Sequence, residues 1–442
     1  MLIVLRTACN TCRQRKLKCD EAFPVCDRCS KAQRYCDRSG RLASTSKHSS
    51  RKDLDAEKSL PLDEAPRKAL ESSDLANYFR HYINNVAPWY DLSDAHLCFS
   101  TEVPTIALDE PLLFSAVIAL SAMVISQTTA SSARTVAEAY HTRCIRRLID
   151  LDSEHVLIKK GVALAATCLL RSYEILSEGR DPNRHLKGAF SLASQFQDCL
   201  DRPSRSLLHS GFWNYLREDI TFSLFGNCPL KIDFDPIPTL RNISSDQDHL
   251  NAISLVLGRI INTMIGSTAK NAGDAWETMW RFVQDWLSNL PTHFRPFSRA
   301  TLPSISRLPT VHILKACHAA SRHYCLVSFA MLAIHAQNAM QVEDLISLAL
   351  SVGLLIGTIM NTEDLLDRIG LEICGIAFTS NDPAVLVNAF GPIFYCARYI
   401  RAEPSQQEVV RHLIASKKAT GWPIQQIVTD LQRRWKTDFP GS

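Results

Sequence analysis

The sequence predicts a mainly α protein with a small cysteine-rich head and a large, all-helical body. Six of the 15 cysteines lie within residues 9–36. From about residue 74 onwards, apolar residues recur at helical spacing, and strand patterns of period two are nearly absent. A chain of 442 residues is too long for one ordinary hydrophobic core, so at least two folded units are expected.

Charged residues are distributed along the chain as unevenly as the cysteines. Residues 1–52 hold 13 Lys/Arg against four Asp/Glu, a net charge of +9, although the whole chain carries only +4. The remaining residues are therefore mildly acidic. A basic head on an acidic body indicates that the head meets an anionic partner.

Two apolar segments are candidates for a signal peptide or a membrane span, and both are too short. The apolar start "MLIVL" is much shorter than the core of a signal peptide. The apolar run at residues 345–360 is shorter than the roughly 18 residues that indicate a membrane span. We expect a protein of the reducing cytosol or nucleus with no membrane partner, where structural disulfides are rare.

The six cysteines of the head form an internal repeat. "CNTCRQRKLKC" and "CDRCSKAQRYC" both have the spacing C-x2-C-x6-C, and six residues separate them. A C-x2-C pair can place two thiolates on one zinc ion, and seven further residues make about two helical turns. The predicted ligands are Cys9, Cys12, Cys19, Cys26, Cys29 and Cys36.

Counting ligands indicates two zinc ions per chain rather than one. Two tetrahedral ions need eight ligand places, and six thiolates fill them if two thiolates bridge both metals. A one-zinc site would leave two thiols idle and would not explain the repeat. Few large apolar residues are present in the head, so we expect Zn²⁺ binding to supply its folding free energy.

The head resembles the fungal binuclear zinc cluster that binds DNA. The cysteine spacing, the basic run and Pro24 before the fourth cysteine all match that family. The resemblance implies that Cys9 and Cys26 bridge the metals and that a short helix enters the major groove at a CGG-like triplet. It also implies that Lys16 contacts bases. Arg15 and Lys18 lie beside Lys16, and Arg13 resembles a phosphate contact.

Two alternative roles suit the residues of the head less well. A basic run on its own is most often a solvated face or an import signal. Beside this cysteine repeat, contact with double-stranded DNA is favoured, because Lys and Arg pair with guanine O6 and N7. A metal buffer of the metallothionein type would need more cysteines and would not need a large helical body.

The body also carries a family resemblance. "VPTIALDEPLLFSAVIALSA", "LLRSYEILSEGRDPNRHLKGA", "FWNYLREDI", "WLSNLP" and the final "GWPIQQIVTDLQRRW" resemble, in this order, the fungal-specific regulatory domain found behind such clusters. The expected organisation is a binuclear zinc-cluster domain at 1–40, a Ser- and Lys-rich flexible linker at 41–73 and an all-α regulatory domain at 74–442. The predicted helices lie at 111–126, 136–151, 161–177, 211–225, 275–290, 312–337, 342–360, 383–400 and 405–416.

Two polar groups within the body could form sites, but both have a structural interpretation that we favour. Arg217, Glu218 and Asp219 could line a ligand site, or they could pair with neighbouring helices. Tyr173, Glu174 and His185 could form a polar site or a satisfied network. No catalytic or phosphate-binding motif is present, so we expect that the protein is not an enzyme. The scattered body cysteines are interpreted as small core residues.

Together the two resemblances imply a sequence-specific transcription regulator of the nucleus, acting on RNA polymerase II promoters. Its expected partners are double-stranded DNA and the transcription machinery or coregulators. The sequence leaves open whether the chain acts as a monomer or a homodimer, since the linker lacks a sustained heptad pattern. It also leaves open whether the body holds a small-molecule effector, with DNA binding as the output.

Overall fold

The structure is a computed structural model, and it describes residues 64–193, 206–234, 243–266, 272–300, 308–380 and 382–438, with Cys29, Lys31, Ala32 and Leu60 besides. The chain divides into two compact units, Met1–Leu60 and Pro61–Ser442. The described residues lie almost entirely in the second unit. The division into 1–40, 41–73 and 74–442 stays a prediction.

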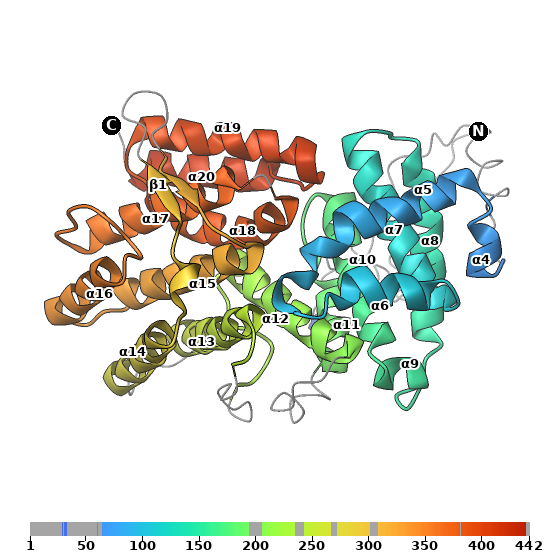
Figure 1. The fold of residues 1–442 in the computed structure, drawn as a ribbon, viewed down its shortest axis with the longest axis horizontal. Coiled ribbons are helices and arrows are strands. Elements are labelled where there is room, and N and C mark those ends of the chain that lie inside the picture. The colour runs from blue at the N-terminus through green and yellow to red at the C-terminus, as the bar shows by residue number, and fades with distance from the viewer. Residues whose placement is uncertain are drawn as a thin grey trace. The chain divides into compact units, whose positions relative to one another are not determined.

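The second unit is built from helices, with one short hairpin among its described residues (Figure 1). This confirms the predicted fold class. The α-helices are α4 (Pro66–Ala69), α5 (Ser73–His81), α6 (Cys98–Ala107), α7 (Pro111–Thr128), α8 (Ala133–Ile149), α9 (Val156–Lys159), α10 (Val162–Glu178), α11 (Arg184–Ala193), α12 (Leu207–Gly226), α13 (Asp246–Gly266), α14 (Ala272–Ser288), α15 (Ala316–Ile334), α16 (Ala339–Ser351), α17 (Thr362–Thr379), α18 (Pro383–Cys396), α19 (Glu403–Thr420) and α20 (Gln425–Asp438). Shorter elements are η2 (Tyr82–Val86), η3 (Ala87–Trp89), η4 (Asp91–Ser93), η6 (Thr292–Phe294), η7 (Ala397–Tyr399), β1 (Ser298–Ala300) and β2 (Thr310–His312).

Helix α7 lies at the centre of the N-terminal half of this unit and packs against α5, α6, α8 and α10. Pro111 occupies its first turn, and the Glu110 carboxylate accepts a hydrogen bond from the Leu112 amide at 3.1 Å. Every residue from Leu112 to Val124 is buried. The helix is long and apolar enough to cross a membrane, but 72% of it is buried inside the unit, as in a core helix of a folded domain.

Helix α6 begins where two carboxylates replace the missing hydrogen-bond partners of its first turn. Asp94 accepts hydrogen bonds from the Cys98 amide at 2.8 Å and from the Ser210 hydroxyl of α12 at 2.6 Å. Asp91 accepts from the amides of Phe99 and Ser100 at 2.8 and 2.9 Å. The side chains therefore cap α6 and fix it to α12.

Helix α10 lies between two glycines with left-handed backbone conformations. Gly161 precedes it with a φ of 78°, and Gly179 follows it with a φ of 74°. Such φ values favour glycine because it has no Cβ. The helix matches the prediction at 161–177 within one residue at each end.

Helix α16 differs from its prediction. The apolar pattern predicts a helix at 342–360, but α16 ends at Ser351. Gly353 and Gly357 adopt φ values of 67° and 98°, which end the helical path. The following residues Leu354 and Leu355 are buried all the same, so the apolar run continues as a loop packed on the core.

The hairpin was not predicted from the sequence. Strand β1 pairs antiparallel with β2, with Arg299 opposite Val311. Strands of three residues are too short to show an alternating pattern. The Val311 amide donates to the Thr379 hydroxyl at 3.0 Å, which ties the hairpin to α17.

Candidate functional site

The predicted zinc ligands and DNA contacts belong to the first unit. Cys9, Cys12, Cys19, Cys26 and Cys36, together with Arg13, Arg15, Lys16 and Lys18, lie outside the described residues, and their roles stay predictions. Cys29 is described, and its side chain is buried. The donor set fits zinc, since thiolates are ligands of structural zinc sites and six of them suffice for two ions when two bridge.

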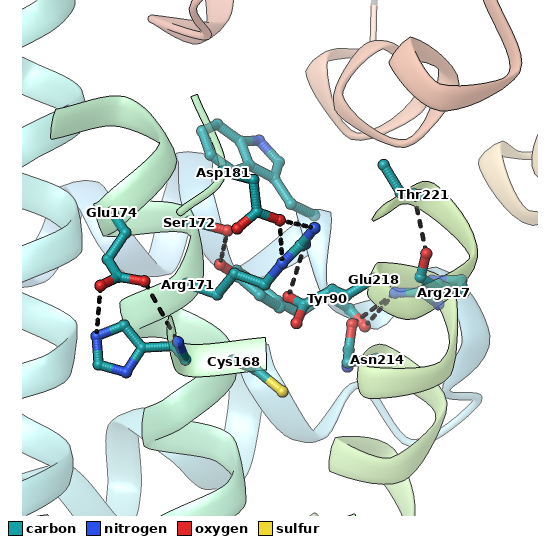
Figure 2. A network of polar contacts seen from close by, with 12 residues as sticks. Tyr90, Cys168, Arg171, Ser172, Glu174, Asp181, Asn214, Arg217, Glu218 and Thr221 are labelled. Atoms are coloured by element: carbon teal, nitrogen blue, oxygen red, sulfur yellow. Dashed lines mark hydrogen bonds and ion pairs between the residues drawn. The ribbon is translucent and has the colours of Figure 1, made fainter. Parts of the chain in front are cut away.

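In the second unit, a buried polar network joins α10 to α12 (Figure 2). Arg171 of α10 donates from Nε and Nη2 to Asp181 Oδ2, at 3.1 and 2.7 Å. Its Nη1 lies 3.9 Å from Glu218 Oε1 on α12. A buried guanidinium needs such partners, because removing an unpaired charge from water is costly. Tyr90 completes this side of the network by donating to the Ser172 hydroxyl at 2.7 Å.

Glu218 is the least satisfied member of this network. Its Oε2 is buried and has no hydrogen-bond partner among the residues that the structure describes. Burial raises the pKa of Glu218 from 4.5 to about 8, against the opposing effect of the Arg171 charge. The carboxyl group is therefore protonated over most of the neutral range.

This pKa makes the stability of the fold depend on pH. Between pH 4.5 and about 8 the unfolded chain releases a proton that folded Glu218 keeps, so the site contributes less stability as pH rises. Glutamine resembles the protonated carboxyl group. We expect Glu218→Gln to match wild-type stability at pH 5 and to exceed it by about 2–4 kcal/mol at pH 8, measured by urea denaturation. Glu277→Gln, at an exposed position of α14, is the control. If the stability difference between Glu218→Gln and the wild type stays constant from pH 5 to pH 8, the raised pKa of Glu218 is contradicted.

The residues on either side of Glu218 point to different partners. Arg217 donates to Asn214 Oδ1 at 2.5 Å and to the Ser93 hydroxyl of η4. Asp219 accepts from the Tyr215 hydroxyl at 2.9 Å and from the Lys231 amide at 2.8 Å. Successive residues on a helix point about 100° apart, so this run does not converge on one ligand. These contacts favour the structural interpretation of Arg217 and Asp219, whereas the ion-pair contact of Glu218 is the one with Arg171 at 3.9 Å.

The members of the second predicted group also contact neighbouring residues, which favours their structural interpretation. The Glu174 carboxylate accepts from Arg184 Nε at 2.6 Å and lies 3.5 Å from His185 Nε2. Tyr173 joins through His141, whose ring stacks on it with centroids 4.1 Å apart. Burial lowers the pKa of His185 to about 3 and that of His141 to about 4, so both rings are neutral at pH 7. Sequence reasoning missed His141, because it lies on α8, remote in sequence.

A cavity of about 280 Å³ opens beside Arg171. Helices α10, α12, α18 and α20 supply its walls, together with the segment after α10 and the residues just before α20. Its aromatic lining consists of Phe222, Phe225, Phe390, Phe394 and Trp422. No motif in the sequence marks this cavity, since each of these residues resembles an ordinary core position of its own segment.

One further charged cluster was missed from the sequence. Asp246, the first residue of α13, lies 2.8 Å from His293 Nε2, 2.9 Å from His318 Nε2 and 2.6 Å from Lys315 Nζ. Cys317 lies close by, and such a group of ligand atoms could hold a metal ion. Lys315 already supplies the positive charge that a metal would bring. We therefore assign the cluster as an ion-pair network that holds η6 and α15 at the start of α13.

Comparison with known proteins identifies two domain families. Residues 7–43 match the fungal Zn(2)-Cys(6) binuclear cluster domain, and residues 77–216 match the fungal specific transcription factor domain. The transcription activator AMTR1 of Alternaria alternata is 71% identical over 31 residues, which are 7% of this chain and 4% of that protein. The uncharacterized transcriptional regulatory protein C15D4.02 of Schizosaccharomyces pombe is 31% identical over 119 residues, 24% of this chain and 22% of that protein.

The chain thus spans less than a quarter of the length of each of these curated relatives. No solved structure gives a significant match. The matched ranges agree with the resemblance of the cysteine-rich head and, in the helical body, with the quoted segments at 103–122 and 169–189. The quoted segments after residue 216 lie outside the match. The chain therefore carries a segment that matches the fungal Zn(2)-Cys(6) binuclear cluster domain, followed by a segment that matches the fungal specific transcription factor domain.

Proposed function

We propose that this protein is a zinc-dependent, sequence-specific regulator of RNA polymerase II promoters that reads CGG-like triplets in the nucleus. The observation that carries the proposal is the doubled C-x2-C-x6-C repeat in a head of net charge +9. Support comes from the family match at residues 7–43 and from the printed names of the relatives, a transcription activator and a transcriptional regulatory protein.

The roles proposed for individual residues of the head rest on the resemblance to the binuclear zinc cluster family, and side-chain chemistry supports them. Two zinc ions, when bound to the six cysteines, supply the cross-links that a segment with few apolar residues needs in order to fold. Cys9 and Cys26 are the proposed bridging ligands. Arg13, Arg15 and Lys18 neutralise phosphates or support the base contact, which gives affinity on any sequence. Lys16 donates to guanine O6 and N7, which gives sequence preference.

Replacing Lys16 and replacing Arg13 are expected to affect DNA binding in different ways. Lys16→Ala should weaken binding to a CGG site by roughly 1–3 kcal/mol and relax the choice of triplet, because a base contact is lost. Arg13→Ala should weaken binding to all sequences similarly and reduce its salt dependence. Fluorescence anisotropy with matched and scrambled duplexes at two salt concentrations measures both effects. An equal loss on all sequences for Lys16→Ala would make Lys16 a phosphate contact instead.

The direct test of the function is selection of bound duplexes from random DNA by the zinc-loaded protein. Enrichment of CGG-like triplets is expected. The spacing between enriched triplets also shows whether the protein binds as a monomer on one triplet or as a homodimer on two. Selection without enrichment of such triplets would reject the proposed readout.

We further propose that the helical unit receives regulatory signals and contacts the transcription machinery or coregulators, and that it has no catalytic role. The domain families and the names of the relatives are those of transcription factors. Arg171 of α10 and Arg217 and Asp219 of α12 are buried and have structural partners, which supports a scaffold rather than a reaction centre.

A further inference from the structure

The cavity beside Arg171 is a pocket that opens to solvent on one side and has room for a small molecule. A buried apolar cavity of about 150 Å³ already holds a benzene molecule. The volume of about 280 Å³ therefore suits a molecule of about two fused rings.

The walls of the cavity suit a flat aromatic body. Phe225 of α12 and Phe394 of α18 lie with ring centroids 4.6 Å apart, and Phe390 stacks on Trp422 at 6.2 Å. Two aromatic pairs thus line one space. Aromatic faces bind flat apolar groups by stacking and edge contacts.

The polar side of the cavity offers hydrogen-bond donors. Arg171 Nη1 makes no hydrogen bond among the described residues, and Glu218 Oε1 lies 3.9 Å from it. Arg180 and Gln426 also line the cavity; both are exposed, and neither side chain has a hydrogen bond or ion pair within the described part of the chain. These groups mark the side on which the cavity meets solvent.

The acidic residues of the lining are already engaged. Asp181 accepts from Arg171 through Oδ2 and from the Asn183 amide through Oδ1, at 2.7 Å. Asp430 accepts from Arg433 at 2.7 Å. The unengaged polar groups are therefore mainly cationic donors, which favours an anionic acceptor on the ligand.

We propose that this cavity binds a small planar aromatic carboxylate, with its rings between Phe225, Phe390 and Trp422 and its carboxylate at Arg171 and Arg180. Such a ligand would fill the space between α20 and helices α10, α12 and α18. It would bind the folded state and therefore stabilise the docking of α20. A regulatory role for this binding rests on the proposed function of the whole protein, but the binding itself does not.

The test uses 2-naphthoate as the anionic probe and 2-naphthamide as its uncharged analogue. Both are titrated by calorimetry into the full-length, zinc-loaded protein without DNA. We expect saturable 1:1 binding of 2-naphthoate with a Kd on the order of 100 µM. Binding of 2-naphthamide should be severalfold weaker. Because DNA is absent, failure here is distinguishable from failure of the proposed DNA readout.

Single substitutions test whether the two probes bind in this cavity. Val387→Phe places a larger side chain on the cavity wall and should abolish binding of both probes, whereas Val156→Phe, at an exposed position of α9, should change neither. Arg180→Gln, at an exposed position that does not endanger folding, should weaken 2-naphthoate binding about two- to fivefold and leave 2-naphthamide unchanged. Circular dichroism checks that each variant is folded.

Three results would overturn the proposal. The first is the lack of saturable binding of 2-naphthoate up to millimolar concentration. The second is undiminished binding to folded Val387→Phe protein. The third is equal affinity for the two probes together with no effect of Arg180→Gln, which would reject the carboxylate class.

Discussion

Replacing Cys9 by alanine is expected to abolish sequence-specific DNA binding. If Cys9 bridges two zinc ions, its loss removes one ligand from each, and no other cysteine of the head is available to replace it. Specific binding should fall to the level of non-specific binding, at least about 1,000-fold weaker at the same salt concentration. Zinc content, measured by mass spectrometry, should fall below two ions per chain.

A matched control separates the cluster from general effects of cysteine removal. Cys228 lies after α12 in the second unit and is partly exposed. Cys228→Ala should keep two zinc ions and full DNA affinity. The helical circular dichroism signal of Cys9→Ala should stay near that of the wild type, because the described helices lie in the second unit. Specific binding by Cys9→Ala protein with two bound zinc ions would contradict the shared-thiolate arrangement.

Replacing Gly161 by alanine is expected to destabilise the helical unit by about 2–5 kcal/mol. Its φ of 78° disfavours any residue with a Cβ, which costs roughly 1–2 kcal/mol. A Cβ at this position would also lie 2.4 Å from the backbone nitrogen of Leu208 and 2.5 Å from its Cα. Backbone atoms cannot rotate away, so α12 itself must shift, and such overpacking costs roughly 1–3 kcal/mol more.

Gly179 provides the control for this prediction at the other end of the same helix. Its φ of 74° is nearly the same, but in the described part of the chain no atom of another segment lies within 4 Å of where its Cβ would be. Gly179→Ala should therefore cost only the conformational part, roughly 1–2 kcal/mol. Urea denaturation of both variants measures the difference, which is the cost of the contact with α12. If both variants lose the same free energy of unfolding, α12 can move away from a Cβ at position 161 at little cost, which would contradict this prediction.

The sequence predicted those parts of the fold that depend on long apolar periodicity. Helices α7, α10 and α18 begin within one residue of their predicted starts, because Pro111, Gly161 and Pro383 mark them. Several helices were missed, among them α13 and α17, although both bury long apolar stretches. Helix α16 was overextended, since burial continues through Leu355 where the backbone has already left the helix.

For the polar interactions of the helical unit, the sequence predicts that buried charged residues have partners, but it does not predict which residues those partners are. Burial of Arg217 and Asp219 was expected to require partners, but their partners Ser93 and Lys231 come from segments whose proximity the sequence does not reveal. The cavity is harder to predict than these contacts, because it depends on how closely the side chains of four helices pack against one another. For the head the reverse holds, since the spacing of six cysteines predicts zinc ligands without any knowledge of the fold.

Burial of the body cysteines has a consequence for the response to oxidants. Seven of the nine cysteines outside the head are buried in the described structure, and Cys228 is partly exposed. Burial raises the pKa of Cys317 to about 11 and that of Cys325 to about 12, so neither forms the reactive thiolate at neutral pH. Alkylating reagents and peroxide should therefore spare these buried thiols in the folded protein. Any loss of activity under mild oxidation then reports on the remaining cysteines, above all on the six of the head.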